Sequence, residues 1–158
     1  MSLFCYNLPM SNSQTEWENT VERVGVVAGC VIKQGNKYLL VQEKQPQSYG
    51  LWNVPAGYVD KGESIEAAAI REAKEESGYD VILDVELAVY HEAITKPVKH
   101  AFEARIVGGE LKIQAEEILD AQWKAYDEIE SLFRQGKIRS PWVWDAINRV
   151  EKESRQPD

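Results

Sequence analysis

Cysteine and histidine are scarce in this sequence, which has two of each among 158 residues. Cys5 and Cys30 are too few and too far apart to suggest a zinc site or a disulfide framework. We expect both to be ordinary thiols, with Cys30 inside a strand. His91 and His100 belong to no catalytic motif and lie in or beside expected strands, so we expect them to be structural.

Long hydrophobic runs are also absent. No stretch stays apolar for the roughly eighteen residues that a membrane-spanning helix needs. The first residues carry neither the basic nor the apolar region of a secretory signal. We therefore expect no membrane partner and a cytoplasmic location.

Positive charge is in short supply, since 18 lysines and arginines stand against 26 acidic residues and the net charge is −8. Binding to a nucleic acid backbone depends on basic side chains that neutralise phosphates, so no nucleic acid polymer is expected as a partner. A small phosphorylated ligand stays possible if a few basic side chains or a divalent cation supply local positive charge.

The composition, 44% hydrophobic and 28% charged, suits one globular domain with an ordinary core. We expect an irregular N-terminal lead-in at 1–20, a single domain over 21–154 and a frayed tail at 155–158. Segments rich in valine, isoleucine and leucine predict strands, and helical periodicity predicts three helices. The expected strands are 24–32, 37–43, 80–94, 98–107, 110–114 and about 121–126, with a short one in 51–64 and a turn at 108–109; the helices are 65–77, 127–136 and one from Pro141.

This order of elements favours an α/β fold, a mixed sheet with helices on its faces. The helix at 65–77 has clear boundaries. Ser64 is placed to cap its N-terminus, Glu66 suits the positive end of the helix dipole, and Gly78 ends the helix.

Acidic residues occupy an unexpected face of this helix. At about 100° per residue, Glu72 and Glu76 lie within the stripe formed by the helix's small and apolar residues, and Glu75 flanks it. A solvated acidic face is the common explanation of such a cluster. Carboxylates on a packed face repel one another, however, and protonation or a bound cation relieves that repulsion. Oxygen ligands on a rigid helix suit Mg²⁺ or Mn²⁺, and no calcium-loop pattern occurs.

The stretch from Gly57 to Tyr79 resembles the Nudix box of the Nudix hydrolases. The matching residues are Gly57, Glu63, Arg71, Glu72, Glu75, Glu76 and Gly78. Two apolar positions are filled atypically, by Ala73 and Tyr79, and "PAG" precedes the box where "PGG" is more frequent. The resemblance implies a Nudix-type α/β/α sandwich with a mixed β-sheet. It also implies hydrolysis of a nucleoside diphosphate linked to another group, which releases a nucleotide monophosphate and the phosphorylated group.

Residue roles follow from the same resemblance. Glu72, Glu75 and Glu76 would bind Mg²⁺, or Mn²⁺ as a substitute, with the Gly57 carbonyl as a further ligand. Arg71 and Glu63 would orient these groups, so that the expected catalytic set is Glu72, Glu76, Arg71 and Glu63. The family places its general base variably. In this chain the candidates are Glu72 and either Glu116 or Glu117, which could also add a metal ligand or simply be an exposed loop pair.

Substrate contacts are less defined by the sequence. Tyr58, beside Gly57, and Trp52 are the first candidates to stack on a base or sugar, with Tyr90 and Trp142 behind them, although large aromatics usually pack in cores. Lys96, Lys99 and Arg105 are candidates for terminal phosphates. Ala93 and Thr95 stand where proline and tyrosine would indicate ADP-ribose or dinucleoside polyphosphates, so a nucleoside triphosphate or a compact conjugate is slightly favoured and ADP-ribose stays open.

Three other interpretations compete with a small-nucleotide hydrolase. A catalytically silent nucleotide-sensing module would keep the fold but lose box glutamates, and none is lost here. An RNA-end processing enzyme is disfavoured by the acidic balance. A plain α/β domain would make the complete box a coincidence. A sheet edge and the apolar last helix leave room for a homodimer.

Overall fold

The computed structural model describes residues 25–156. The expected lead-in at 1–20, with Cys5, and the last two residues of the expected tail lie outside that range. The described chain forms strands and helices in the following order: β1 (Val26–Gln34), β2 (Lys37–Glu43), a 3₁₀ turn (Pro46–Ser48), β3 (Trp52–Asn53), β4 (Ala56–Tyr58), α2 (Ile65–Ser77), β5 (Tyr79–Tyr90), β6 (Val98–Gly109), β7 (Ile118–Ala125), α3 (Tyr126–Arg134) and α4 (Pro141–Arg155).

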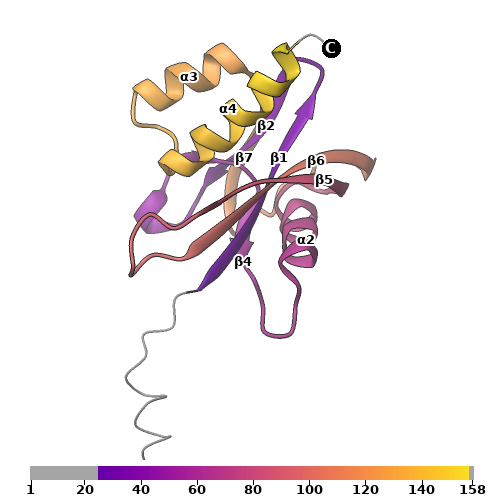
Figure 1. Ribbon diagram of the computed structural model, residues 1–158, viewed down its shortest axis with the longest axis vertical. Helices are drawn as coiled ribbons and strands as arrows, with labels where there is room; N and C mark the ends of the chain where they lie inside the picture. Colours follow the sequence, from indigo (N-terminus) through magenta and orange to yellow (C-terminus); the bar gives the residue numbers. More distant parts are fainter. Residues whose placement is uncertain (1–24, 157–158) are drawn as a thin grey trace, which may run out of the picture.

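The strands form one mixed sheet in the order β3-β2-β1-β6-β5, with β4 paired to β1 and β7 paired to β2. β1 and β6 run parallel, whereas the other pairs between named strands are antiparallel. Helix α2 covers one face, and α3 with α4 covers the other (Figure 1). The predicted α/β/α sandwich is therefore confirmed.

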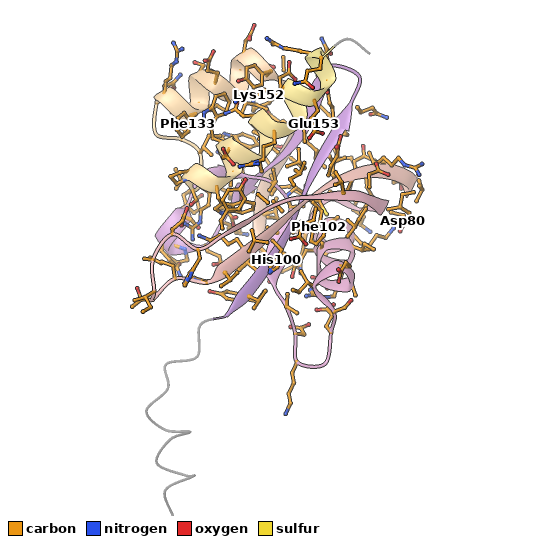
Figure 2. The ribbon with its side chains drawn as sticks, in the orientation of Figure 1. Asp80, His100, Phe102, Phe133, Lys152 and Glu153 are labelled. Carbon is orange, nitrogen blue, oxygen red and sulfur yellow. The ribbon has the colours of Figure 1, made fainter. Side chains whose placement is uncertain are left out.

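Alternation along the central strands divides the core into two clusters. Cys30 and Ile32 of β1 pack toward the alanines of α2, whereas Val31 between them packs toward α4. Successive strand residues point to opposite faces, so one buried strand supplies both layers. Phe102 of β6 belongs to the α2 cluster, and Figure 2 shows it inside the molecule while Phe133, Lys152 and Glu153 lie on the outer helices.

Helix α2 begins and ends where the sequence predicts. The Ser64 hydroxyl accepts a hydrogen bond from the Ala67 amide at 3.1 Å, and Gly78 adopts the left-handed conformation with φ of 81°. Gly78 also donates its amide to the Lys74 carbonyl at 2.9 Å. Both caps are local, which is why the sequence alone locates this helix.

The Ser64 cap has a measurable effect on stability. Because Ser64→Ala leaves the Ala67 amide without its partner, we expect the free energy of unfolding to fall by about 1 kcal/mol. Ser64→Asp keeps an accepting oxygen and should retain most of that stability. Urea denaturation of the three proteins tests this, and equal losses in both variants would contradict the capping role.

The expected strand at 110–114 is wrong, as is the hairpin turn at 108–109. Strand β6 continues through both glycines, and Gly109, with φ of 77°, ends it. The following residues cross the end of α2, where Lys112 donates its amide to the Ser77 carbonyl at 2.8 Å. The Lys112 amide is thus bonded to a helix carbonyl and not to a neighbouring strand.

Three further boundaries differ from those expected. β5 ends at Tyr90 rather than at position 94, β7 starts at Ile118 rather than near Ala121, and α4 extends to Arg155, into the expected tail. Cys30 lies in β1 as predicted, and burial raises the pKa of its thiol to about 12. None of the helices within residues 25–156 is long and apolar enough to cross a membrane.

Candidate active site

Glu72 and Glu76 face the packed side of α2, as the helical wheel predicts. Their exposed fractions are 8% and 5%, so the solvated-face interpretation is wrong for both. Glu75 flanks them, with a side chain 44% exposed. The helix therefore directs two carboxylates toward the sheet, against β4.

Burial raises the pKa of the Glu72 carboxyl, and the nearby carboxylates of Glu75 and Glu117 raise it further, while Arg71 opposes these effects. The pKa of Glu76 is raised more strongly, first by burial and then by Glu72 and Glu43. The hydrogen bond from the Ala56 amide to Glu76 Oε2, at 3.1 Å, offsets only part of this rise. Without a cation, these carboxylates resist ionisation.

Arg71 connects the helix to the loop before it. Its Nε and Nη2 donate to Glu63 at 2.8 and 3.1 Å, and Nη1 donates to Glu72 at 2.7 Å and to Glu75 at 3.1 Å. Nη2 also donates to the Tyr58 carbonyl at 3.0 Å. The hydrogen bond to Arg71 is the main cause that lowers the pKa of Glu63. Arg71 and Glu63 therefore fix the position of the loop relative to the carboxylates of the helix.

Gly57 lies directly against Glu72. A Cβ at Gly57 would come within 2.2 Å of the Glu72 carboxylate, so a side chain there would force that carboxylate to move. Its φ is not in the left-handed region, so close approach rather than backbone conformation requires glycine here. The Glu72 carboxylate thus occupies the space above the backbone of β4.

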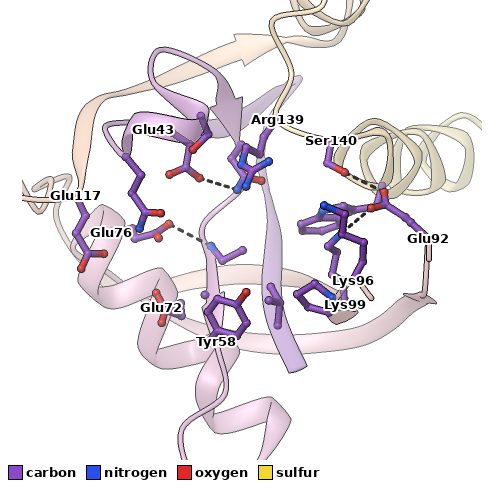
Figure 3. Close-up of a pocket in the computed structure, with 18 of the residues that line it drawn as sticks. Glu43, Tyr58, Glu72, Glu76, Glu92, Lys96, Lys99, Glu117, Arg139 and Ser140 are labelled. Carbon is purple, nitrogen blue, oxygen red and sulfur yellow. Dashed lines mark hydrogen bonds and ion pairs between the residues drawn. The ribbon is translucent and has the colours of Figure 1, made fainter. Parts of the chain in front are cut away.

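These residues open onto a cavity of about 510 Å³ (Figure 3). Two groups of opposite charge line it. The carboxylate wall consists of Glu43, Glu72, Glu76 and Glu117; the basic wall consists of Lys96, Lys99 and Arg139. In Figure 3 the carboxylates gather on the side of α2 and β2, and Lys96 and Lys99 lie across the cavity beside Glu92 and Ser140.

The structure separates the two candidates in the loop before β7. Glu117 lines the cavity, whereas Glu116 lines a different hollow beside Lys74 and Glu75. Sequence reasoning missed Glu43 and Arg139. Glu43 ends β2 and accepts a hydrogen bond from Asn53 Nδ2 at 2.8 Å. Its one signal in the sequence is its place at a strand end just before the loop that leads to Gly57.

The carboxylate wall suits a divalent cation in its chemistry. It offers buried oxygen ligands with raised pKa values, and Asn53 Oδ1 adds a buried oxygen with no hydrogen-bond partner in the described chain. Between residues 25 and 156, no three acidic, histidine or cysteine side chains already converge as a metal shell would.

Comparison with known proteins decides the family. The family model described as "NUDIX domain" matches residues 23–143, most of the chain. The chain belongs to the Nudix family. The match includes the whole box and both walls of the cavity.

Individual relatives agree with this assignment. An NAD-capped RNA hydrolase NudC of Salmonella agona is 31% identical over 153 residues, which cover 92% of this chain and 59% of that protein. A NUDIX hydrolase structure from Nitrosomonas europaea has a TM-score of 0.75 and 31% identity, and covers 85% of this chain and 93% of its own. A Caenorhabditis elegans Ap4A hydrolase, at 22% identity, TM-score 0.66 and coverage of 83% and 98%, shows the shared fold alone. The chain spans 29–60% of the length of the curated relatives that it matches.

The aromatic candidates of the Nudix domain separate by burial. Tyr58 is 60% exposed and lines the cavity. Trp52 is only 7% exposed and packs in the α4 cluster, with Lys124 Nζ 4.8 Å from the centre of its ring, so it does not line the cavity. Trp142 lines the cavity but is 4% exposed, and the Tyr90 hydroxyl donates to Asp145.

The remaining polar candidates also separate. Lys96 and Lys99 line the cavity, whereas Arg105 pairs with Asp84 at 3.0 Å on another part of the surface. His91 lies in the loop after β5, and His100 Nδ1 lies 3.5 Å from Glu86 Oε1. Neither histidine lines the cavity, which agrees with a structural role.

Proposed function

We propose that this Nudix domain hydrolyses the pyrophosphate linkage of a nucleoside diphosphate joined to another group, with Mg²⁺ as cofactor and Mn²⁺ as a substitute. The observation that carries the proposal is the pair of buried carboxylates, Glu72 and Glu76, opening onto a cavity that also holds basic side chains. The carboxylates alone would repel a pyrophosphate, and a divalent cation held by them would neutralise that repulsion.

Glu72, Glu75 and Glu76 would hold the cation, with the Gly57 carbonyl beside them. The bound ion would neutralise phosphate oxygens and lower the pKa of a coordinated water. Of the general-base candidates, Glu72 and Glu117 line the cavity, and either would accept a proton from the attacking water. The water oxygen bonds to phosphorus, the P–O bond of the bridge breaks, and the products are a nucleotide monophosphate and a phosphorylated group.

The supporting residues act through position. Arg71 and Glu63 fix the loop and the helix carboxylates, and Tyr58, exposed at the cavity, is available to stack on a base. Trp52 is not retained in this role because its ring is buried. Cytoplasmic location and a homodimer stay predictions.

The test is a panel of nucleoside triphosphates, nucleotide sugars, ADP-ribose, NAD, dinucleoside polyphosphates and, because one relative is named for it, NAD-capped RNA. Each is incubated with Mg²⁺, with Mn²⁺ and after metal removal. We expect metal-dependent release of a nucleotide monophosphate from one small-molecule class. If no member is hydrolysed while a nucleotide still raises the melting temperature, the domain is a nucleotide-sensing module instead.

Gly57→Ala tests whether the position of Glu72 matters to this reaction. The added Cβ displaces the Glu72 carboxylate by about an ångström or more, and a shift of that size lowers kcat by about 100-fold. Gly108→Ala, far from the cavity and with its nearest neighbour, the Asp80 side chain, at 3.3 Å, is the matched control. Steady-state kinetics on the preferred substrate measure both, and equal rates in the two variants would contradict the role given to Gly57.

A further inference from the structure

The basic wall is unusual in a protein with a net charge of −8. Lys96 and Lys99 come from the β5–β6 connection and the start of β6, whereas Arg139 comes from the segment before α4. Residues from distant parts of the sequence thus bring positive charge to the same cavity as the box carboxylates. The remaining question is which of these charges is free to meet a ligand.

Lys99 is already neutralised. Its Nζ lies 2.6 Å from Glu92 Oε2, and the Ser140 hydroxyl donates to Glu92 Oε1 at 2.9 Å. Lys99 is the main cause that lowers the pKa of Glu92, so the acid stays ionised. These contacts tie the β5–β6 connection to the residue that precedes α4, and they hold the basic wall in place.

Lys96 and Arg139 are not neutralised. Both are exposed and line the cavity, and neither makes an ion pair within the described part of the chain. Glu92 makes its ion pair with Lys99 and interacts with Lys96 only at longer range, so the side-chain donors of Lys96 and Arg139 stay open to a ligand. The N-terminus of α4, a fifteen-residue helix, begins beside it, and Ser140 caps no amide there. The helix dipole therefore adds to the positive potential.

We propose that Lys96 and Arg139, which line the same cavity as the carboxylate wall, bind a further phosphate of the substrate directly and without metal. This inference rests on the proposed function, because the carboxylate wall must hold the scissile linkage through its cations. Preferred substrates therefore carry an additional charged phosphate, as a nucleoside triphosphate does. When the nucleotide is joined to an uncharged sugar instead, the sugar offers no negative charge to Lys96 and Arg139.

The choice of phosphate follows from geometry and charge. An arginine guanidinium presents a planar fork of donors that matches two phosphate oxygens, and a lysine that lines the same cavity adds a mobile point charge. A carboxylate ligand would supply less charge to the same pair. The two walls together thus discriminate between substrates by the charge of the group beyond the scissile bond.

The kinetic test compares ATP with ADP-ribose, which share the adenosine and differ in the additional phosphate. We expect Arg139→Gln to raise KM for ATP by about 10-fold, since one charge-assisted contact is worth roughly 1.5 kcal/mol, while KM for ADP-ribose changes by less than about 2-fold. Lys96→Gln should act in the same direction. Arg134→Gln removes an equal charge from α3, outside the cavity, and is the control. Equal effects of Arg139→Gln on both substrates overturn the proposal.

A metal-free measurement separates this inference from the proposed function. Calorimetry with inorganic tripolyphosphate is carried out on protein freed of metal by a chelating resin. It measures binding to the basic wall alone, because without metal the carboxylate wall repels the anion. We expect binding to the wild type and to Arg134→Gln, weakened about 10-fold in Arg139→Gln. If neither nucleotide is hydrolysed but this pattern holds, the hydrolase proposal falls and the anion site stands. The anion-site proposal is overturned if the wild type does not bind tripolyphosphate, or if Arg134→Gln and Arg139→Gln bind it equally well.

Discussion

Glu76→Gln is expected to lower metal-dependent hydrolysis by on the order of 10²–10³-fold while the protein stays folded. The side chain is only 5% exposed, and Ala56 donates its amide to it at 3.1 Å. Glutamine keeps an oxygen for that hydrogen bond, so the local packing survives. It removes the charge that a cation requires, and the chemistry is lost.

The same substitution should stabilise the metal-free protein at neutral pH. Burial, then Glu72 and Glu43, raise the folded-state pKa of Glu76 above its unfolded value. Glu76 therefore contributes stability when it is protonated, below its unfolded pKa, and that contribution is lost as the pH rises through the folded pKa. Glutamine does not titrate. The melting temperature of Glu76→Gln should thus exceed that of the wild type at pH 7.5, and the difference should shrink as the pH falls.

Thermal melts in chelator from pH 4.5 to 8, with hydrolysis assays alongside, measure both effects. Glu66→Gln, an exposed carboxylate on the first turn of the same helix, is the control: it should leave activity unchanged and, because it loses a favourable charge at the positive end of the helix, lower the melting temperature slightly rather than raise it. An unfolded Glu76→Gln protein, or one with full activity, would be incompatible with the role assigned to Glu76.

Arg71→Ala is expected to reduce activity and stability together. Its guanidinium binds Glu63, Glu72 and Glu75, and its removal leaves the largely buried Glu72 carboxylate without the positively charged side chain that pairs with it. Breaking a partly buried charge pair in this way costs roughly 2–3 kcal/mol of unfolding free energy, and the loop before α2 loses its anchor to the helix. Since Glu72 would also move, we expect kcat to fall by about 100-fold.

Two variants isolate the cause. Arg71→Lys keeps the charge but not the fork of donors, so it should recover part of the stability and little of the activity. Lys74→Ala, on the same helix, removes an exposed pair with Asp80 of β5 and should cost less than about 1 kcal/mol. Urea denaturation and kinetics on all three proteins measure these effects. Full activity in Arg71→Ala would show that the guanidinium does not position the carboxylates.

Local signals explain what the sequence predicts well. Ser64 and Gly78 bound α2 by contacts within a few residues, and helical spacing alone places Glu72 and Glu76 on the packed face. The strand predicted at 110–114 fails because its amide at Lys112 binds the end of α2, a contact with a helix that closes only in the folded chain. Propensity cannot report such a partner.

The cavity itself depends on long-range contacts. Glu43 enters it from the end of β2 and Arg139 from the segment before α4, and neither belongs to a motif. The sequence also does not predict the direction in which a loop side chain points. Glu116 and Glu117 are adjacent and chemically identical, yet the turn before β7 sends only Glu117 into the cavity.

Uptake of Mn²⁺ by the carboxylate wall tests the central claim most directly, because the paramagnetic resonance signal of free Mn²⁺ falls as the ion binds. We predict that the wild type removes Mn²⁺ from solution, that Glu66→Gln does so equally, and that a protein carrying both Glu72→Gln and Glu76→Gln binds at least about 10-fold more weakly. Unchanged uptake by the double variant would contradict the account, since the cation would then be held elsewhere.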